Sequence, residues 1–209
     1  MRFSEMTIEE FLIRAASVQP TPGGGAVSAI ACALGVSMAS MVANLTLGKE
    51  KYAEVQKSME QVVVGCKQLS TALLVAADND AEAFLLVMQA YGLPQHTENE
   101  KVLRQVAIQH ALWEAVKPPL LIANLCRDAI GQGVVVLQKG NSTAQSDAKV
   151  AIFLAQAALH SAVANIDANL QLLNEGERKT QLVFEKKELV LDASLKIKKV
   201  QSIIEGLSE

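Results

Sequence analysis

The most informative candidates for chemistry are two carboxylates, Asp78 and Asp80, in a stretch of good helix formers. Residues two positions apart on a helix point in different directions, so the two cannot both face one site. Asp80 shares one helix face with Phe84 and Val87, at spacings of four and three. A carboxyl group beside apolar side chains has a raised pKa, as a general acid or base needs. Asp80 is therefore a candidate catalytic residue. The alternative, which we expect for Asp78, is a solvated or paired carboxylate.

Three glycines, Gly23, Gly24 and Gly25, follow Pro20 and Pro22 and lead into a long helix of small residues. The first N–H groups of a helix have no intrahelical partner and lie at the positive end of its dipole. Because glycine has no side chain, such a loop can bind a carboxylate or a polarised carbonyl. A tight turn between two closely packed helices explains the same residues equally well. The phosphate-binding pattern GxxxxGK[ST] is absent from the sequence.

Further polar residues stand at the ends of predicted helices. Ser146 and Asp147 follow a polar loop at the start of an apolar helix, where they could bind a ligand or simply cap the helix. Lys49 is the first cation after a long uncharged run and could meet a ligand carboxylate or be solvated. Asp167 is alone in an otherwise uncharged stretch of helix between Lys149 and Glu175, so it is either paired or functional.

Helical segments separated by proline and glycine must position these residues. Thr7 and Glu10 have the spacing of a capping box at a helix start. The apolar periodicity predicts an all-α fold, an antiparallel multi-helix bundle with long helices, in a single domain that spans residues 1–209. One short apolar run, 134–137, fits a strand or a helix. The predicted helices cover residues 7–18, the glycine triplet to 47, 51–91, 98–116, 118–139, 146–173 and 182–207.

The composition narrows the classes of function. Half of the 209 residues are apolar and only 4% are aromatic, which favours closely packed helices. A net charge of −3 makes nucleic acid a poor candidate for a partner. The three cysteines are far apart and no histidine stands at metal-ligand spacing, so we expect neither a metal site nor a disulfide framework. The N-terminal segment has acids where a signal peptide would need a basic lead, so we expect a cytoplasmic protein.

One uncharged segment, residues 15–48, resembles a membrane span in length and apolarity. Its Ser, Thr and Asn residues and the lack of an aromatic belt favour a helix buried in protein, so no membrane contact is expected. Several predicted helices are apolar around most of their circumference. A bundle of this size could not cover all of them, which indicates a homodimer.

Four segments, in this order over nearly the whole chain, carry a family resemblance. They are Pro20-Thr-Pro-Gly-Gly-Gly-Ala-Val-Ser28, Met41-Val-Ala-Asn-Leu-Thr46 with Gly48 and Lys49 after it, Asp80-Ala-Glu-Ala-Phe84, and Ser146-Asp147 with Val150-Ala151. Together they resemble the family of formiminotetrahydrofolate cyclodeaminase and bacterial methenyltetrahydrofolate cyclohydrolase. The first two segments are quite specific, whereas the others would be weak alone. The chain departs from the family after Asn141, where it has Ser-Thr-Ala-Gln instead of the expected Pro-Asn-Ala-Val.

The resemblance implies an all-α homodimer that acts on a reduced folate, with no cofactor besides that substrate. It leaves two reactions open. In one, N10 attacks the formimino carbon on N5 and ammonia leaves; in the other, water opens the methenyl ring to the 10-formyl compound. Both pass through a tetrahedral carbon between nitrogens and need a proton shuttle. By the resemblance, Asp80 is the shuttle, Asp147 a second acid or pterin anchor, Gly23, Gly24, Gly25 and Asn44 shape the pocket, Lys49 meets the glutamate tail, and Ser146 completes the substrate-binding set.

The sequence contains no formiminotransferase segment, which favours the cyclohydrolase reaction or a separate formiminotransferase partner. Two other readings stay open. One is a folate-binding protein without turnover, and the other is a helical dimer with a structural role in which the glycine loop is only a turn.

Overall fold

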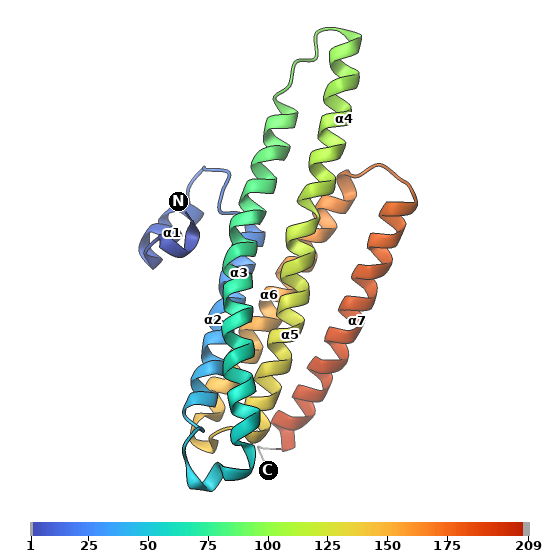
Figure 1. Ribbon diagram of the computed structural model, residues 1–209. Helices are drawn as coiled ribbons and strands as arrows, with labels where there is room; N and C mark the ends of the chain where they lie inside the picture. The colour runs from blue at the N-terminus through green and yellow to red at the C-terminus, as the bar shows by residue number, and fades with distance from the viewer. Residues whose placement is uncertain (1, 207–209) are drawn as a thin grey trace.

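The computed structural model describes residues 2–206, and within that range it consists of helices and loops without a β-strand (Figure 1). The predicted all-α fold with long helices is therefore confirmed. The longer helices are α1 (Ile8–Ala15), α2 (Gly24–Asn44), α3 (Gln56–Tyr91), α4 (Glu98–Ala115), α5 (Lys117–Lys139), α6 (Gln145–Leu172) and α7 (Glu177–Gly206), with short 3-10 helices η1 (Phe3–Glu5), η2 (Glu50–Val55) and η3 (Ser142–Ala144).

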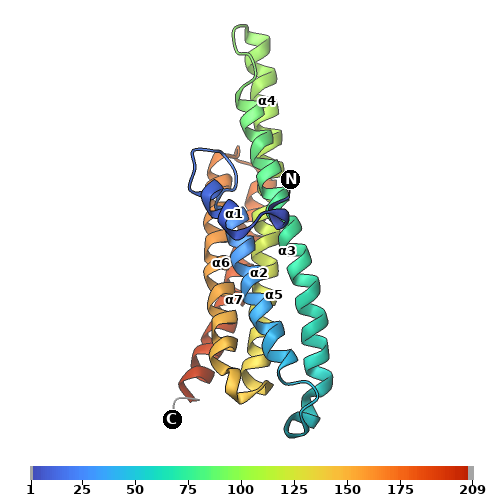
Figure 2. The same ribbon diagram turned by 90° about the vertical axis from the view of Figure 1, so that its left-hand side faces the viewer.

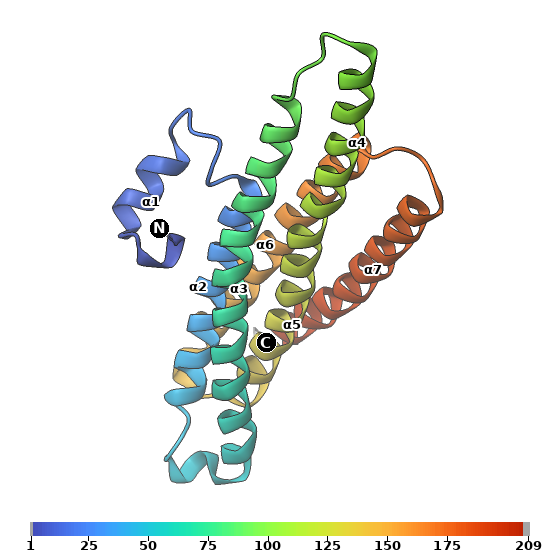
Figure 3. The ribbon, with the colours of Figure 1, turned by 45° about the horizontal axis from the view of Figure 1, so that its top comes forward.

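The long helices pack side by side as a bundle, in which α2 contacts α3, α5 and α6 and α5 also contacts α4 and α7. Only Val116 separates α4 from α5, because Pro118 and Pro119 fit the first turn of a helix. The far ends of α3 and α4 extend beyond the other helices, and α1 lies outside the bundle (Figures 1 and 3). In Figure 2, α6 and α7 lie on one side of α2, and α3 lies on its other side.

Small residues allow α2 and α6 to approach closely in antiparallel directions. Gly24 at the start of α2 lies beside Asn165, whereas Gly35 lies beside Ala151 near the start of α6. A Cβ at Gly35 would be 2.8 Å from the Ala151 carbonyl oxygen, which is shorter than any normal contact. The close helix approach expected from the small residues is thus present.

Several helix ends differ from the predicted ones for local reasons. The capping box of Thr7 and Glu10 is present, but α1 ends at Ala15 because the Ser17 hydroxyl bonds the Arg14 carbonyl beyond it. Residues 50–55 form a 3-10 helix rather than the start of α3, since the Tyr52 hydroxyl is tied to the backbone of the loop before α6. Residues 134–137 are helical.

The last helix begins at Glu177, five residues before the predicted start at Leu182. Two contacts hold its first turn in place. Lys179 pairs with Glu175 at 2.6 Å, and the Arg178 guanidinium lies 4.3 Å from the centre of the Trp113 ring. Such local contacts between loop and helix start are invisible to apolar periodicity.

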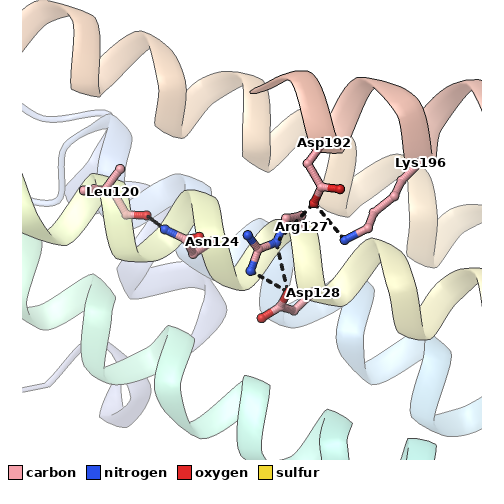
Figure 4. Close-up of polar contacts among 6 residues, drawn as sticks. All are labelled: Leu120, Asn124, Arg127, Asp128, Asp192 and Lys196. Atoms are coloured by element: carbon pink, nitrogen blue, oxygen red, sulfur yellow. Dashed lines mark hydrogen bonds and ion pairs between the residues drawn. The ribbon is translucent and has the colours of Figure 1, made fainter. Parts of the chain in front are cut away.

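Polar pairs attach α7 to its neighbours. Lys186 on α7 forms an ion pair with Asp167 on α6, so of the two alternatives for Asp167 the structure shows the paired one. On α5, Arg127 lies between Asp128 and Asp192, and Asp192 also contacts Lys196 at 3.0 Å (Figure 4). At least one partner of each pair is 45–50% exposed, so solvent screens these pairs and we expect each to contribute little to the free energy of unfolding.

Three helical stretches, one of them α2, are long and apolar enough to cross a membrane by length and composition. In α2, 56% of the most apolar window is buried inside the bundle, where it packs against other helices. More than half of this window of α2 thus has protein neighbours. The absence of membrane contact stays a prediction.

We expect two glycine substitutions to change stability in opposite directions. Gly35→Ala places a Cβ against a backbone oxygen that cannot move independently, so it should lower the free energy of unfolding by about 1–3 kcal/mol. Gly131→Ala, in α5, meets no atom within 4 Å and should raise it by about 0.5–1 kcal/mol. Urea unfolding of both variants checks this. A Gly35→Ala protein as stable as the wild type would contradict the close approach of α2 and α6.

Candidate active site

A cavity of about 330 Å³ lies where the start of α2 meets the other helices of the bundle. Its walls come from the proline-glycine loop, the second half of α3, the end of α4 and the last turns of α6. No lining residue carries a positive charge. The cavity is lined by Pro20, Thr21, Gly23, Gly24, Asp80, Ala81, Phe84, Val87, Leu112, Ala115, Asn165, Ala168, Asn169 and Leu172.

The start of α2 and Asp80 of α3 are in direct contact at this cavity. The Ala26 N–H donates to Asp80 Oδ2 at 3.0 Å. A Cβ on Gly25 would lie 2.1 Å from Asp80 Oδ1, so only glycine leaves room for the carboxylate. The N-terminal end of α2 therefore binds a carboxylate of the protein itself. The sequence left two alternatives for the glycines, free backbone N–H groups that bind a carboxylate or a close approach of two helices. Each of the two describes part of this contact.

Burial raises the pKa of Asp80 above its ordinary value, and the hydrogen bond from Ala26 opposes this in part. Phe84 and Val87 line the same cavity, as their spacing from Asp80 predicted. A carboxyl group whose ionised form is disfavoured by apolar neighbours can take up and release a proton at moderate pH. Asp78 instead accepts a hydrogen bond from the Phe3 N–H at 2.9 Å.

The other predicted site residues lie at the opposite end of the bundle. Asn44 ends the same helix that Gly24 begins, which separates the two by about 30 Å at 1.5 Å per residue. Ser146 and Asp147 are at the start of α6, whereas the cavity is near its end. One chain thus brings Gly23, Gly24, Gly25 and Asp80 together and leaves the remaining predicted residues outside their cavity.

Hydrogen bonds join the two segments next to which the second group lies. Tyr52 in η2 accepts a hydrogen bond from the Ser142 N–H at 2.9 Å, and the Asn141 N–H donates to Thr46 Oγ1 at 2.8 Å. These bonds tie the loop before α6 to the segment after α2, which contains Lys49. The described part of the chain therefore has a polar end opposite the cavity.

Individual members of that group have their own surroundings. Asn44 lines an open groove of about 620 Å³ between α2 and α3, together with Ser40 and Lys67. Ser146 and Asp147 lie inside the first turn of α6, after its N-cap residue Ala144, so neither is the N-cap.

Sequence reasoning missed two residues of the cavity, Asn165 and Asn169. They are four positions apart on α6 and so share a face. Charge drew attention to Asp167 on this helix, which pairs with Lys186 of α7 instead. Two amides at helical spacing in an apolar helix were a signal that could have been used.

Metal-ligating side chains do not gather in the described residues, where no three of His, Cys, Asp and Glu come together. Cys32, Cys66 and Cys126 are buried free thiols. The chemistry that the cavity offers comes from a carboxyl group, two amides and backbone groups.

Comparison with known proteins agrees with this architecture. A family model described as formiminotransferase-cyclodeaminase matches residues 7–188. Methenyltetrahydrofolate cyclohydrolase of Methylorubrum extorquens is 44% identical over 81% of this chain and 81% of its own length. Formimidoyltransferase-cyclodeaminase of Gallus gallus is 31% identical over 77% of this chain, but the match covers only 30% of that longer protein.

A crystal structure of formiminotetrahydrofolate cyclodeaminase from Thermotoga maritima has a TM-score of 0.87 and 28% identity, over 99% of both chains. The helical bundle with a carboxylate cavity is thus of the cyclodeaminase class of folds. The chain belongs to the formiminotransferase-cyclodeaminase family, and the resemblance seen in its four segments is confirmed.

We expect Gly25→Ala to displace the Asp80 carboxylate, because the new Cβ would overlap it. Turnover of the tetrahydrofolate substrate should fall at least about ten-fold, with a loss of about 1–3 kcal/mol in the free energy of unfolding. Gly176→Ala is the matched control, since a Cβ there meets nothing within 4 Å. Steady-state kinetics of both variants checks this, and full activity of Gly25→Ala would argue against Asp80 as the reacting group.

Proposed function

We propose that the protein is a methenyltetrahydrofolate cyclohydrolase, which converts 5,10-methenyltetrahydrofolate and water to 10-formyltetrahydrofolate. The observation that carries the proposal is Asp80, a carboxylate with a raised pKa in a cavity without a cation. The methenyl carbon lies between N5 and N10 in a positively charged amidinium group. A cavity that offers only a carboxylate and neutral polar groups suits such a cation.

The residues at the cavity can catalyse this reaction by proton transfer. Ionised Asp80 accepts a proton from the water that attacks the methenyl carbon. The tetrahedral carbon then loses its bond to N5, and Asp80 returns the proton to N5. The second proton of the water leaves as the formyl carbonyl forms, so the products are 10-formyltetrahydrofolate and one proton.

The choice of the hydrolytic reaction rests on similarity. The relative named a cyclohydrolase is 44% identical over most of both chains, whereas the named cyclodeaminases are 28% and 31% identical. The second candidate is formiminotetrahydrofolate cyclodeaminase, because the fold match to the Thermotoga maritima enzyme spans the whole chain. In that reaction Asp80 would donate a proton to the departing ammonia. A separate formiminotransferase would then supply the substrate.

We include a homodimer in the proposal, because it would bring the cavity of one chain beside the polar end of the other. No charged residue occurs between Arg14 and Lys49 or between Lys149 and Asp167. The outer surface of α2 and α6 therefore carries uncharged side chains, among them Leu34 and Phe153, which are 56% and 53% exposed.

A second copy packed on this surface in the antiparallel direction would place its Lys49, Ser146 and Asp147 beside the Asp80 cavity of the first. The Asp80 cavity has no cation of its own, so Lys49 of the second copy would supply the positive charge that the resemblance assigns to the glutamate tail. On this proposal the predicted site residues belong to one site that two chains build. We also propose a cytoplasmic location and a single domain over residues 1–209.

The purified protein should turn over 5,10-methenyltetrahydrofolate, seen as loss of the absorbance of the methenyl compound, and it should be assayed beside 5-formiminotetrahydrofolate. Asp80→Asn should lower kcat by about 10²–10⁴-fold, because the amide cannot accept the proton. Turnover of the formimino compound alone would favour the second candidate. Turnover of neither compound would overturn the proposed function.

Two further measurements serve as controls. They are the pH dependence of wild-type activity and the thermal stability of the Asp80→Asn variant. Wild-type activity should fall as pH falls through the raised pKa of Asp80, since the base must be ionised. A raised pKa also means that Asp80 stabilises the fold only at low pH and that this contribution is lost as pH rises through it. Asparagine can still accept from Ala26, so at pH 7 the variant should melt no lower than the wild type. A large loss of stability would indicate a structural role.

The dimer is tested by mass and by mixing subunits. Sedimentation should give twice the 22.4 kDa chain mass, and Leu34→Asp should shift the protein toward monomers. Asp80→Asn and Asp147→Asn should each be inactive alone, and mixed subunits should recover activity because one site of each heterodimer is intact. If Asp147→Asn is fully active, or mixing restores nothing, the shared site is wrong.

A further inference from the structure

Each of the two asparagines of the cavity already makes one hydrogen bond within the protein, through its amide nitrogen. Asn165 Nδ2 donates to the Ser161 carbonyl at 2.8 Å, and Asn169 Nδ2 donates to the Ala115 carbonyl at 2.9 Å. A carbonyl can only accept, so these partners fix which end of each amide is nitrogen. Each side chain keeps an Oδ1 that accepts no hydrogen bond from residues 2–202.

The Ala115 carbonyl explains why Asn169 is held in this way. In a continuous helix the N–H of residue 119 would donate to it, but Pro119 has no N–H. The amide of Asn169 takes that place at the junction of α4 and α5. Its orientation is thus set by a fixed feature of the backbone, and Oδ1 is left on the other side of the amide.

Position also favours a role in binding. The amide of Asn165 lies beside Gly24, where a Cβ would be 3.0 Å from Nδ2 and 3.2 Å from Oδ1. Asp80 lies beside the next glycine, Gly25. The loop glycines therefore bring Asn165 and Asp80 to the same wall, and Asn169 is one helical turn from Asn165.

We infer that Asn165 and Asn169 form a hydrogen-bond-accepting edge that selects a heterocycle rich in N–H donors and orients it toward Asp80. This inference rests on the proposed function, and there the heterocycle is the pterin ring, whose pyrimidine side carries a ring N–H and an amino group. The two amide oxygens accept from those donors, while Asp80 Oδ1 stays available for the reacting centre. A ring alkylated at these nitrogens lacks the donors and is discriminated against, because the amide oxygens that the bound ring covers are then left unpaired.

Two substitutions at Asn165 separate acceptance from a structural role. Both Asn165→Leu and Asn165→Asp lose the donor to the Ser161 carbonyl, but only leucine loses the acceptor. We expect Asn165→Leu to raise the dissociation constant of tetrahydrofolate about ten-fold or more, with a smaller change in kcat than in KM. Asn165→Asp should bind tetrahydrofolate at least as tightly as the wild type.

Asn124→Leu is the matched control, because Asn124 on α5 donates to the Leu120 carbonyl in the same way and lies outside the cavity (Figure 4). It should leave the dissociation constant unchanged. Equal weakening by Asn165→Leu and Asn165→Asp, or no weakening by either, would overturn the inference while leaving Asp80 chemistry intact. Failure of the wild-type protein to bind tetrahydrofolate or to turn over either substrate would instead overturn the proposed function.

Discussion

The contact between the Ala26 N–H and the Asp80 carboxylate is the interaction on which the site depends. It joins the open start of α2 to the middle of α3, across 54 positions of sequence. The helix end favours the ionised carboxylate, whereas burial disfavours it, and burial has the larger effect on the pKa. A carboxyl group held between opposing influences keeps a defined position and can still exchange a proton. The lack of a Cβ at Gly25 is what makes that position accessible.

Most of the fold could be predicted because local rules act along each helix. Apolar spacing and the prolines marked the helices, and the spacing of Asp80, Phe84 and Val87 placed all three at one cavity. Helix ends were less predictable, since contacts from distant segments decide them. Tyr52, for example, is drawn out of a regular helix by its bond to the loop before α6.

The division of the candidate site into two ends was missed for a different reason. Motif resemblance groups residues without regard to distance, although the rise of a single helix already separates Gly24 from Asn44. Asn165 and Asn169 were overlooked because neutral amides give no charge signal in a sequence. Their significance comes from the backbone around them, above all from the missing N–H of Pro119.

The shortage of aromatic residues also has a practical consequence. Trp113 is the chain's one tryptophan, and it stands next to Leu112 of the cavity wall and beneath the guanidinium of Arg178 at the start of α7. Its indole therefore contacts the first turn of the last helix. The fluorescence emission of this one tryptophan therefore reports whether the start of α7 is packed in place, without any added label.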